Sequence, residues 1–151
     1  MSKGKKSGKT WLIILGVILA IIVILVVLGI VFLPKTILLE DSQIFDKQTV
    51  KQRAEEVIGT VSMDDYSTLL TVYANETLEQ GLSMETMRSA KEGINSNWGL
   101  MQQIISENYY ETEQNKITYA LAIIEVQYEN VAVTYTLSFD TDMKLAGIYL
   151  K

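Results

Sequence analysis

The chain has 151 residues, with 18 acidic and 13 basic side chains, a formal net charge of −5, and neither cysteine nor histidine. Without cysteine it forms no disulfide bond and carries no lipid attached through a thiol, and without histidine it has no imidazole for acid–base catalysis. All acidic residues but only nine basic ones follow residue 33, so this part carries 9 − 18 = −9. Such an acidic surface repels polyanions, and we expect no nucleic acid partner.

The first 33 residues divide into a basic tail and an uncharged run. The 23 residues from Trp11 to Leu33 have no charged, amide or hydroxyl side chain. As a helix they would reach about 34 Å, enough to cross the roughly 30 Å hydrocarbon core of a bilayer. We therefore predict a transmembrane signal anchor at 11–33, in which Gly16 and Ala20 form a small-xxx-small pair. The cytoplasmic basic tail at 1–10 contains Lys3, Lys5, Lys6 and Lys9.

A cleaved signal peptide is the alternative for this segment. The apolar core of a signal peptide is usually about 7 to 15 residues long and ends at small residues, which 11–33 does not match. Because the lysines precede the apolar run, we expect the N-terminus to be cytoplasmic and the remainder to lie outside the cell membrane. The lipid bilayer is then one partner of the chain. After the anchor we expect a short juxtamembrane linker at 34–42 and an extracytoplasmic domain at 43–151.

Three helices are expected in the first half of that domain. The first, at 42–59, has an apolar stripe with helical spacing, formed by Val50, Ala54, Val57, Ile58 and Val61. A second follows a cap at Asp64 or Asp65 and ends before Gly81, and a third begins after a cap at Ser83 and ends at Gly99.

After Gly99 the apolar spacing changes from a helical period to alternation, which predicts strands at 100–111, 116–129, 131–139 and 144–150. The connections between them are short, so neighbouring strands should be antiparallel. In the second strand the apolar residues change parity, and we interpret this as a bulge near Ile123. The expected fold class is α+β, with about three helices packed on the concave face of a curved four-stranded antiparallel sheet.

Three segments carry a resemblance to a known family. They are Thr136 to Leu150, with the sequence TLSFDTDMKLAGIYL, the triplet Asp64-Asp65-Tyr66, and the segment from Leu82 to Met87. Over roughly 43–150 the chain resembles small exported domains of unknown function from Gram-positive bacteria, which have a cone-shaped nuclear-transport-factor-2-like fold. The resemblance implies a pocket between the helices and the sheet. The side chains expected to line it are Tyr66, Tyr73, Trp98, Tyr119, Tyr128 and Tyr135.

The acidic residues near this pocket have structural explanations. Asp64 and Asp65 are explained as helix caps, and Asp140 and Asp142 as residues of a hairpin turn that lacks the further ligands of a calcium loop. Glu125 and Glu129 have the parity of the side chains that face water. We therefore expect no catalytic residue, no cofactor and no metal site.

The sequence favours a single-pass membrane protein whose external domain binds a protein, peptide or small envelope ligand at the outer membrane surface without catalysing a reaction. Two alternatives remain at this point: a pocket enzyme that acts on a small apolar molecule, and a structural subunit of a larger membrane complex. A homodimer is a further option for the partner.

Overall fold

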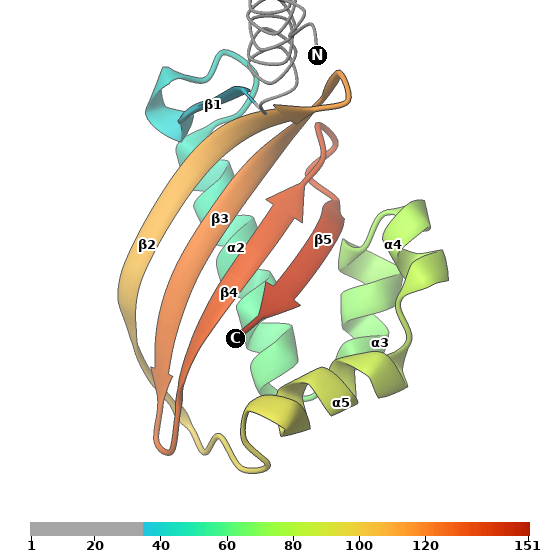
Figure 1. The fold of residues 1–151 in the computed structure, drawn as a ribbon, viewed down its shortest axis with the longest axis vertical. Helices are drawn as coiled ribbons and strands as arrows, with labels where there is room; N and C mark the ends of the chain where they lie inside the picture. The colour runs from blue at the N-terminus through green and yellow to red at the C-terminus, as the bar shows by residue number, and fades with distance from the viewer. Residues whose placement is uncertain (1–34) are drawn as a thin grey trace, which may run out of the picture. The chain divides into compact units, whose positions relative to one another are not determined.

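The computed structural model describes residues 35–151, whose five strands form an antiparallel sheet in the order β1-β2-β3-β4-β5 (Figure 1). Two consecutive residues with positive φ, Asn115 and Lys116, make the tight turn between the long strands β2 and β3. The antiparallel arrangement of these strands is confirmed. The strands are β1 (Lys35–Leu38), β2 (Met101–Gln114), β3 (Ile117–Tyr128), β4 (Ala132–Phe139) and β5 (Leu145–Leu150).

Four α-helices lie between β1 and β2 in the chain, and side-chain caps are present at their N-terminal ends. Asp46, Asp65 and Ser83 each accept a hydrogen bond from the backbone N–H three residues later; the caps at Asp65 and Ser83 were expected from the sequence. The helices are α2 (Lys47–Ser62), α3 (Tyr66–Thr68), α4 (Glu76–Gly81) and α5 (Met84–Ile94), with a 3₁₀ turn η1 (Leu39–Asp41) and a π-helical turn η2 (Leu69–Tyr73).

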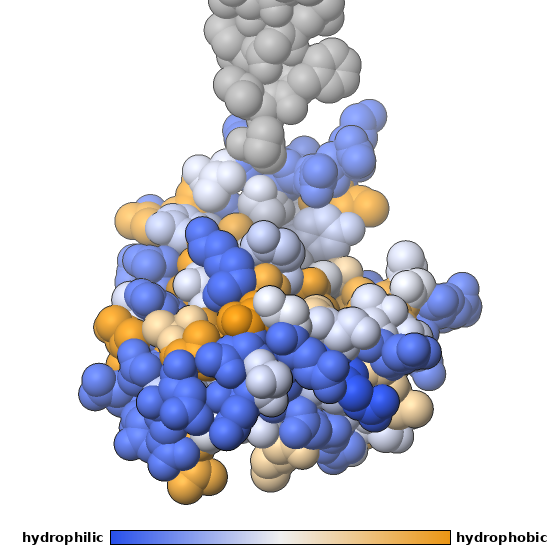
Figure 2. All heavy atoms as spheres, turned by 60° about the horizontal axis from the view of Figure 1, so that its bottom comes forward, coloured by the Kyte–Doolittle hydropathy of each residue, from blue (hydrophilic) through white to orange (hydrophobic). Residues whose placement is uncertain are grey.

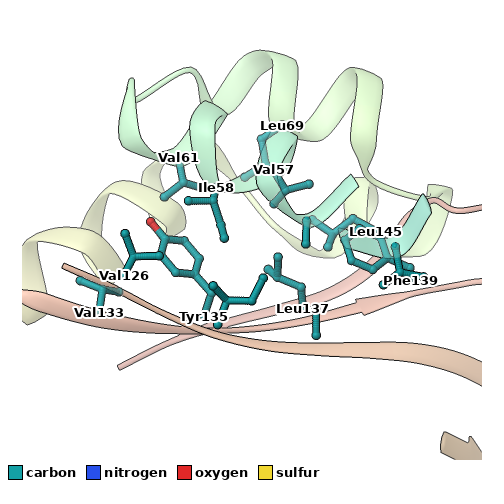
Figure 3. Close-up of a cluster of buried hydrophobic side chains, with 14 of the residues drawn as sticks. Val57, Ile58, Val61, Leu69, Val126, Val133, Tyr135, Leu137, Phe139 and Leu145 are labelled. Carbon is teal, nitrogen blue, oxygen red and sulfur yellow. The ribbon is translucent and has the colours of Figure 1, made fainter. Parts of the chain in front are cut away.

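The core lies between one face of the sheet and the helices (Figure 3). From α2 it contains Val57, Ile58 and Val61, which are at most 1% exposed. These side chains pack with fully buried residues of β4 such as Tyr135 and Leu137. Burying such side chains stabilises the fold by about 1.5–3 kcal/mol each relative to exposure.

The prediction of a β-bulge near Ile123 is wrong. Ala120, Ala122 and Ile124 are all fully buried, so β3 keeps one parity and Ile123 lies on the opposite face. The apparent change of parity in the sequence has another cause, because both faces of β3 carry apolar side chains. The register shifts instead occur within β2, between Met101 and Gln103 and between Ile104 and Ser106, and at the end of β4 against β5.

The third predicted helix is too long. α5 ends at Ile94, and Asn95 has an extended backbone with φ of −161°. Trp98 therefore lies in the loop between α5 and β2, where it is buried to 3% exposure. The first predicted helix begins at Lys47 instead of 42, because Ser42 accepts backbone hydrogen bonds from Ile44 and Phe45 in a turn before the helix.

The predicted fold class is corrected in three respects, although α+β is confirmed. Within residues 35–151 the sheet has five strands instead of four, because β1 pairs with Tyr110 to Glu113 of β2, and there are four α-helices instead of three. The segment expected to be a linker at 34–42 contributes β1 and the buried Leu39 to the folded unit. Its first residue lies outside the described residues.

The third correction concerns the transmembrane helix. Within residues 35–151 no helix is both long enough and apolar enough to span a bilayer, so the structure does not support a single transmembrane helix as part of the fold. The residues expected to form the anchor, among them Trp11, Gly16, Ala20 and Leu33, and the lysine-rich tail lie outside the described residues.

Candidate functional site

Three of the aromatic residues predicted to line a pocket pack against one another. The ring centroids of Trp98 and Tyr128 are 5.0 Å apart, and those of Trp98 and Tyr135 are 6.4 Å apart with the rings almost perpendicular. Such tilted and edge-to-face pairs are favourable aromatic geometries. All three side chains are at most 3% exposed, so they fill the space between the helices and the sheet at this end of the domain.

The two tyrosines belong to a chain of hydroxyl groups that ends on α2. Tyr128 Oη lies 2.6 Å from Tyr135 Oη and 2.7 Å from Ser62 Oγ, and Ser62 donates to the carbonyl of Ile58 at 2.7 Å. Each hydroxyl has one hydrogen and the carbonyl only accepts, so Tyr135 donates to Tyr128 and Tyr128 donates to Ser62. Burial raises the pKa of Tyr135 and of Tyr128 above the ordinary tyrosine value, so both are neutral donors at physiological pH.

Tyr66, also predicted for the pocket, belongs to a second polar group beside this cluster. Its hydroxyl donates to Asp64 Oδ1 at 2.7 Å, and Lys91 Nζ donates to the same oxygen at 2.7 Å. Burial raises the pKa of Tyr66, and the neighbouring Asp64 carboxylate raises it further. For Asp64, burial acts in the opposite direction to hydrogen bonds from Lys91 and Tyr66, and the hydrogen bonds prevail, so its pKa is lowered.

Lys91 is held from several sides. Besides Asp64, its ammonium group donates to the carbonyl of Val61 at 3.2 Å, and it lies 4.8 Å from the centre of the Trp98 ring. Trp98 Nε1 in turn donates to the Lys91 carbonyl at 3.2 Å. This lysine therefore connects α5, the end of α2 and the aromatic cluster, and only 13% of its side chain is exposed.

An open cleft of about 200 Å³ lies over this lysine, between α5 and the turn that joins α2 to α3. Its walls carry both signs of charge. Arg88 and Glu92 come from the same side of α5, one turn apart, and Asp64 comes from the turn. The lining residues are Asp64, Tyr66, Arg88, Lys91, Glu92, Asn95 and Ser96.

The other two residues predicted for the pocket lie elsewhere. Tyr73 is half-buried at the end of η2 beneath Arg53, whose guanidinium carbon is 5.5 Å from the ring centre. Tyr119 pairs with Thr112 and has the parity of β3 that points away from the core. The structure therefore brings together Tyr66, Trp98, Tyr128 and Tyr135 and separates Tyr73 and Tyr119 from them.

The acidic residues discussed from the sequence occupy the surface. Glu129 accepts from the backbone N–H of Leu100 at 2.9 Å, Asp140 accepts from those of Asp142 and Lys144, and Glu125 is opposite Thr134 on β4. Within residues 35–151 no group of three or more acidic side chains is arranged to hold a metal ion.

The side of the sheet opposite the helices forms a second candidate surface. Figure 1 shows this side toward the viewer, with α2 behind the sheet and no described helix in front of it. We call it the outer sheet face. Leu38 and Tyr149 on this face are 52% and 62% exposed. Eight uncharged residues that are connected by strand pairing form a patch on it: Leu38, Tyr110, Tyr119, Leu121, Ile123, Thr136, Ser138 and Tyr149. Glu125, which has the parity of Ile123, lies on the same side of the sheet next to this patch.

Sequence reasoning missed the cleft and interpreted Asp64 only as a cap. The neighbouring Asp65 is the cap, and Asp64 has a φ of 58° in the turn before α3. The signal available was the spacing of Arg88, Lys91 and Glu92, which places three charges on one side of a helix that begins at a well-defined cap. What they face depends on how α5 packs against the end of α2.

Comparison with other proteins gives two matches. A solved structure described as "NMR structure of protein from Ruminococcus gnavus ATCC 29149" has a TM-score of 0.64 and 27% identity, and the match covers 76% of this chain and 98% of that chain. Comparison with curated proteins gives no match. The family described as "Protein of unknown function (DUF3887)" matches residues 54–148, which include α3, α4, α5, strands β2 to β4 and the first part of β5. The chain belongs to this family, DUF3887.

Proposed function

We propose that this domain is a binding module that recognises a protein partner through the outer sheet face and has no catalytic activity of its own. One observation carries the proposal: eight uncharged residues, several of them large and apolar, form a connected patch on the outer sheet face of a domain with a net charge of −9. Contiguous apolar surface without a covering element is typical of protein contact sites, and exposed tyrosines are frequent at their centres.

The packing of the interior supports binding over catalysis. A pocket enzyme of the kind considered above requires a carboxylate enclosed with a tyrosine in an apolar cavity. The carboxylate that bonds a tyrosine here is Asp64, whose side chain is 64% exposed. The space where the pocket was expected is filled by Trp98, Tyr128 and Tyr135.

We further propose that the domain works outside the cytoplasm, close to the membrane surface. The support for this location is the uncharged sequence of residues 11–33 and the four lysines that precede it. We also propose a finer relationship, to exported Gram-positive domains of the nuclear-transport-factor-2-like fold, on the sequence resemblance at Thr136 to Leu150, Asp64 to Tyr66 and Leu82 to Met87.

The test is crosslinking on intact cells with a membrane-impermeant, amine-reactive reagent, comparing the wild-type chain with two charge-adding variants. Tyr149→Glu places a carboxylate on the outer sheet face, and Met84→Glu places one on α5, where Met84 is 51% exposed. We expect a specific crosslinked product with the wild type and Met84→Glu, and about tenfold less with Tyr149→Glu, because loss of an exposed aromatic contact and the burial of an added carboxylate weaken an interface by about that much or more.

A product of twice the mass of the chain would identify a second copy as the partner. If Tyr149→Glu, shown to be folded by circular dichroism, crosslinks as well as the wild type, the outer sheet face is not the contact site. If the domain does not react with the reagent on intact cells, the proposed location is wrong.

A further inference from the structure

The cleft over Lys91 contains charged groups whose hydrogen-bonding capacity is only partly used. Lys91 itself is occupied, because its ammonium group already donates to Asp64 and to the Val61 carbonyl and lies 3.5 Å from the Ser62 carbonyl. An ammonium group has three hydrogens, so Lys91 has little left to offer a bound anion. Its role is to hold Asp64 and the cleft floor in place.

Three other charged groups in the cleft retain capacity. Asp64 uses Oδ1 for both Lys91 and Tyr66, while Oδ2 accepts from no described residue. Arg88 and Glu92 line the cleft and form no ion pair within residues 35–151. Arg88 lowers and Glu92 raises the pKa of Tyr66, which agrees with both charges lying near that hydroxyl.

The charges in the cleft balance. Arg88 and Lys91 contribute two positive charges, and Asp64 and Glu92 contribute two negative ones. A simple anion is attracted by Arg88 but repelled by the two carboxylates, and a simple cation is attracted by the carboxylates but repelled by Arg88 and Lys91. A molecule that carries a carboxylate and an ammonium group close together satisfies both sides.

The space limits the size of such a molecule. The cleft volume of about 200 Å³ is below the roughly 300–1,000 Å³ that is usual for the site of a drug-sized ligand. A small amino acid or the terminal residue of a peptide is of this size.

We propose that this cleft binds a small α-amino-acid zwitterion. Its carboxylate pairs with the Arg88 guanidinium, whose planar donors suit bidentate contact, and Ser96 lines the same cleft. Its ammonium group is taken up by Glu92 and by the unused Oδ2 of Asp64. This site lies on α5, in a different part of the structure from the outer sheet face. The two proposals are therefore independent, and failure of one does not decide the other. Figure 2 shows the end of the domain where α5 lies, with hydrophilic side chains predominating.

The experiment is an NMR titration of the full chain with three probes: L-alanine, propionate, which has only the carboxylate, and ethylamine, which has only the ammonium group. The reporters are the Trp98 indole N–H, which is bonded to the Lys91 carbonyl, and the backbone amides of residues 95–97. We expect saturable shifts with L-alanine and at least about tenfold weaker binding of either single-charge probe, because each lacks one charge-assisted contact.

Variants separate the site from general charge effects. Arg88→Gln and Glu92→Gln should each weaken L-alanine binding by about tenfold. The matched controls Arg53→Gln on α2 and Glu85→Gln on α5 change the same residue types outside the cleft and should leave binding unchanged. The proposal is overturned if L-alanine causes no saturable shift, if propionate or ethylamine binds as tightly, or if the cleft variants behave like the controls.

Discussion

At the scale of single residues, the most informative group is the chain of hydroxyls from Tyr135 through Tyr128 to Ser62. Both tyrosines alternate with polar residues along their strands, as side chains on a core face do, and both are buried. Alternation carries no information about the partner of a buried hydroxyl, which here is supplied from α2. The residues expected to line a pocket here instead form a packed cluster, and their hydroxyl groups hydrogen-bond to one another.

Removing the two hydroxyls should have unequal effects. In Tyr128→Phe the buried Tyr135 hydroxyl loses the acceptor to which it donates, whereas in Tyr135→Phe the Tyr128 hydroxyl keeps its bond to Ser62. An unsatisfied buried donor costs about 1–3 kcal/mol, so we expect a loss of about 2 kcal/mol for Tyr128→Phe and about 1 kcal/mol for Tyr135→Phe. Urea unfolding followed by tryptophan fluorescence measures both, with the exposed Tyr149→Phe as control. Equal losses for the two buried variants would contradict the direction assigned to the chain.

At the scale of elements, the sequence located most helices and strands but misplaced their ends. The extension of the third helix to Gly99 followed from the apolar spacing of Met87, Ile94 and Trp98, which suits one helical face. In the structure Trp98 reaches the core from a loop. Gly99 has a φ of 73° and allows the chain to turn into β2, with Leu100 bonded to Glu129. Gly99 therefore belongs to the turn that leads into β2 and does not end a helix.

Two glycines near this junction should respond oppositely to alanine. At Gly99 an added Cβ would lie 2.5 Å from Glu129 Oε2 and the backbone is left-handed, so Gly99→Ala should destabilise the fold by about 1–3 kcal/mol. At Gly93, inside α5, the space is open, and Gly93→Ala should stabilise by about 0.5–1 kcal/mol through higher helix propensity. Thermal unfolding of the two variants decides the matter. A neutral Gly99→Ala would mean that this turn tolerates a side chain.

At the scale of the whole domain, residues before the first long helix complete the fold. β1 extends the sheet beside β2, and Leu39 is 2% exposed in the same core as α2. A segment of four strand residues followed by a 3₁₀ turn has too few positions to show a period, so its sequence resembles a linker. Pairing with β2, more than 70 residues later in the chain, determines its structure.

The buried tyrosines of the domain together predict how stability depends on pH. Burial raises the pKa values of Tyr66, Tyr109, Tyr128 and Tyr135 above the ordinary value near 10. A folded-state pKa above the unfolded one contributes stability that is complete below pH 10 and is lost as pH rises, because the unfolded tyrosine ionises first. The free energy of unfolding should therefore fall above about pH 10 by about 1.4 kcal/mol per pH unit for each such tyrosine.

Urea unfolding between pH 8 and pH 11 tests this dependence. Above pH 10 the free energy of unfolding of Tyr135→Phe should fall less steeply with pH than that of the wild type, whereas that of Tyr149→Phe should fall as steeply as the wild type. A slope in Tyr135→Phe that equals the wild-type slope would mean that Tyr135 does not contribute to alkaline unfolding.

The sequence by itself determined the α+β class, the four strands from residue 100 onward and their antiparallel order, the cap at Ser83, and a cap at either Asp64 or Asp65. These features depend on local propensity, on alternation and on short connections, all of which are encoded within a few residues. Only the tertiary structure decided the fifth strand, the position of Trp98 and the grouping of Asp64, Lys91 and Arg88 around one cleft. Each of these depends on contacts between residues distant in the chain, which pattern within a segment does not specify.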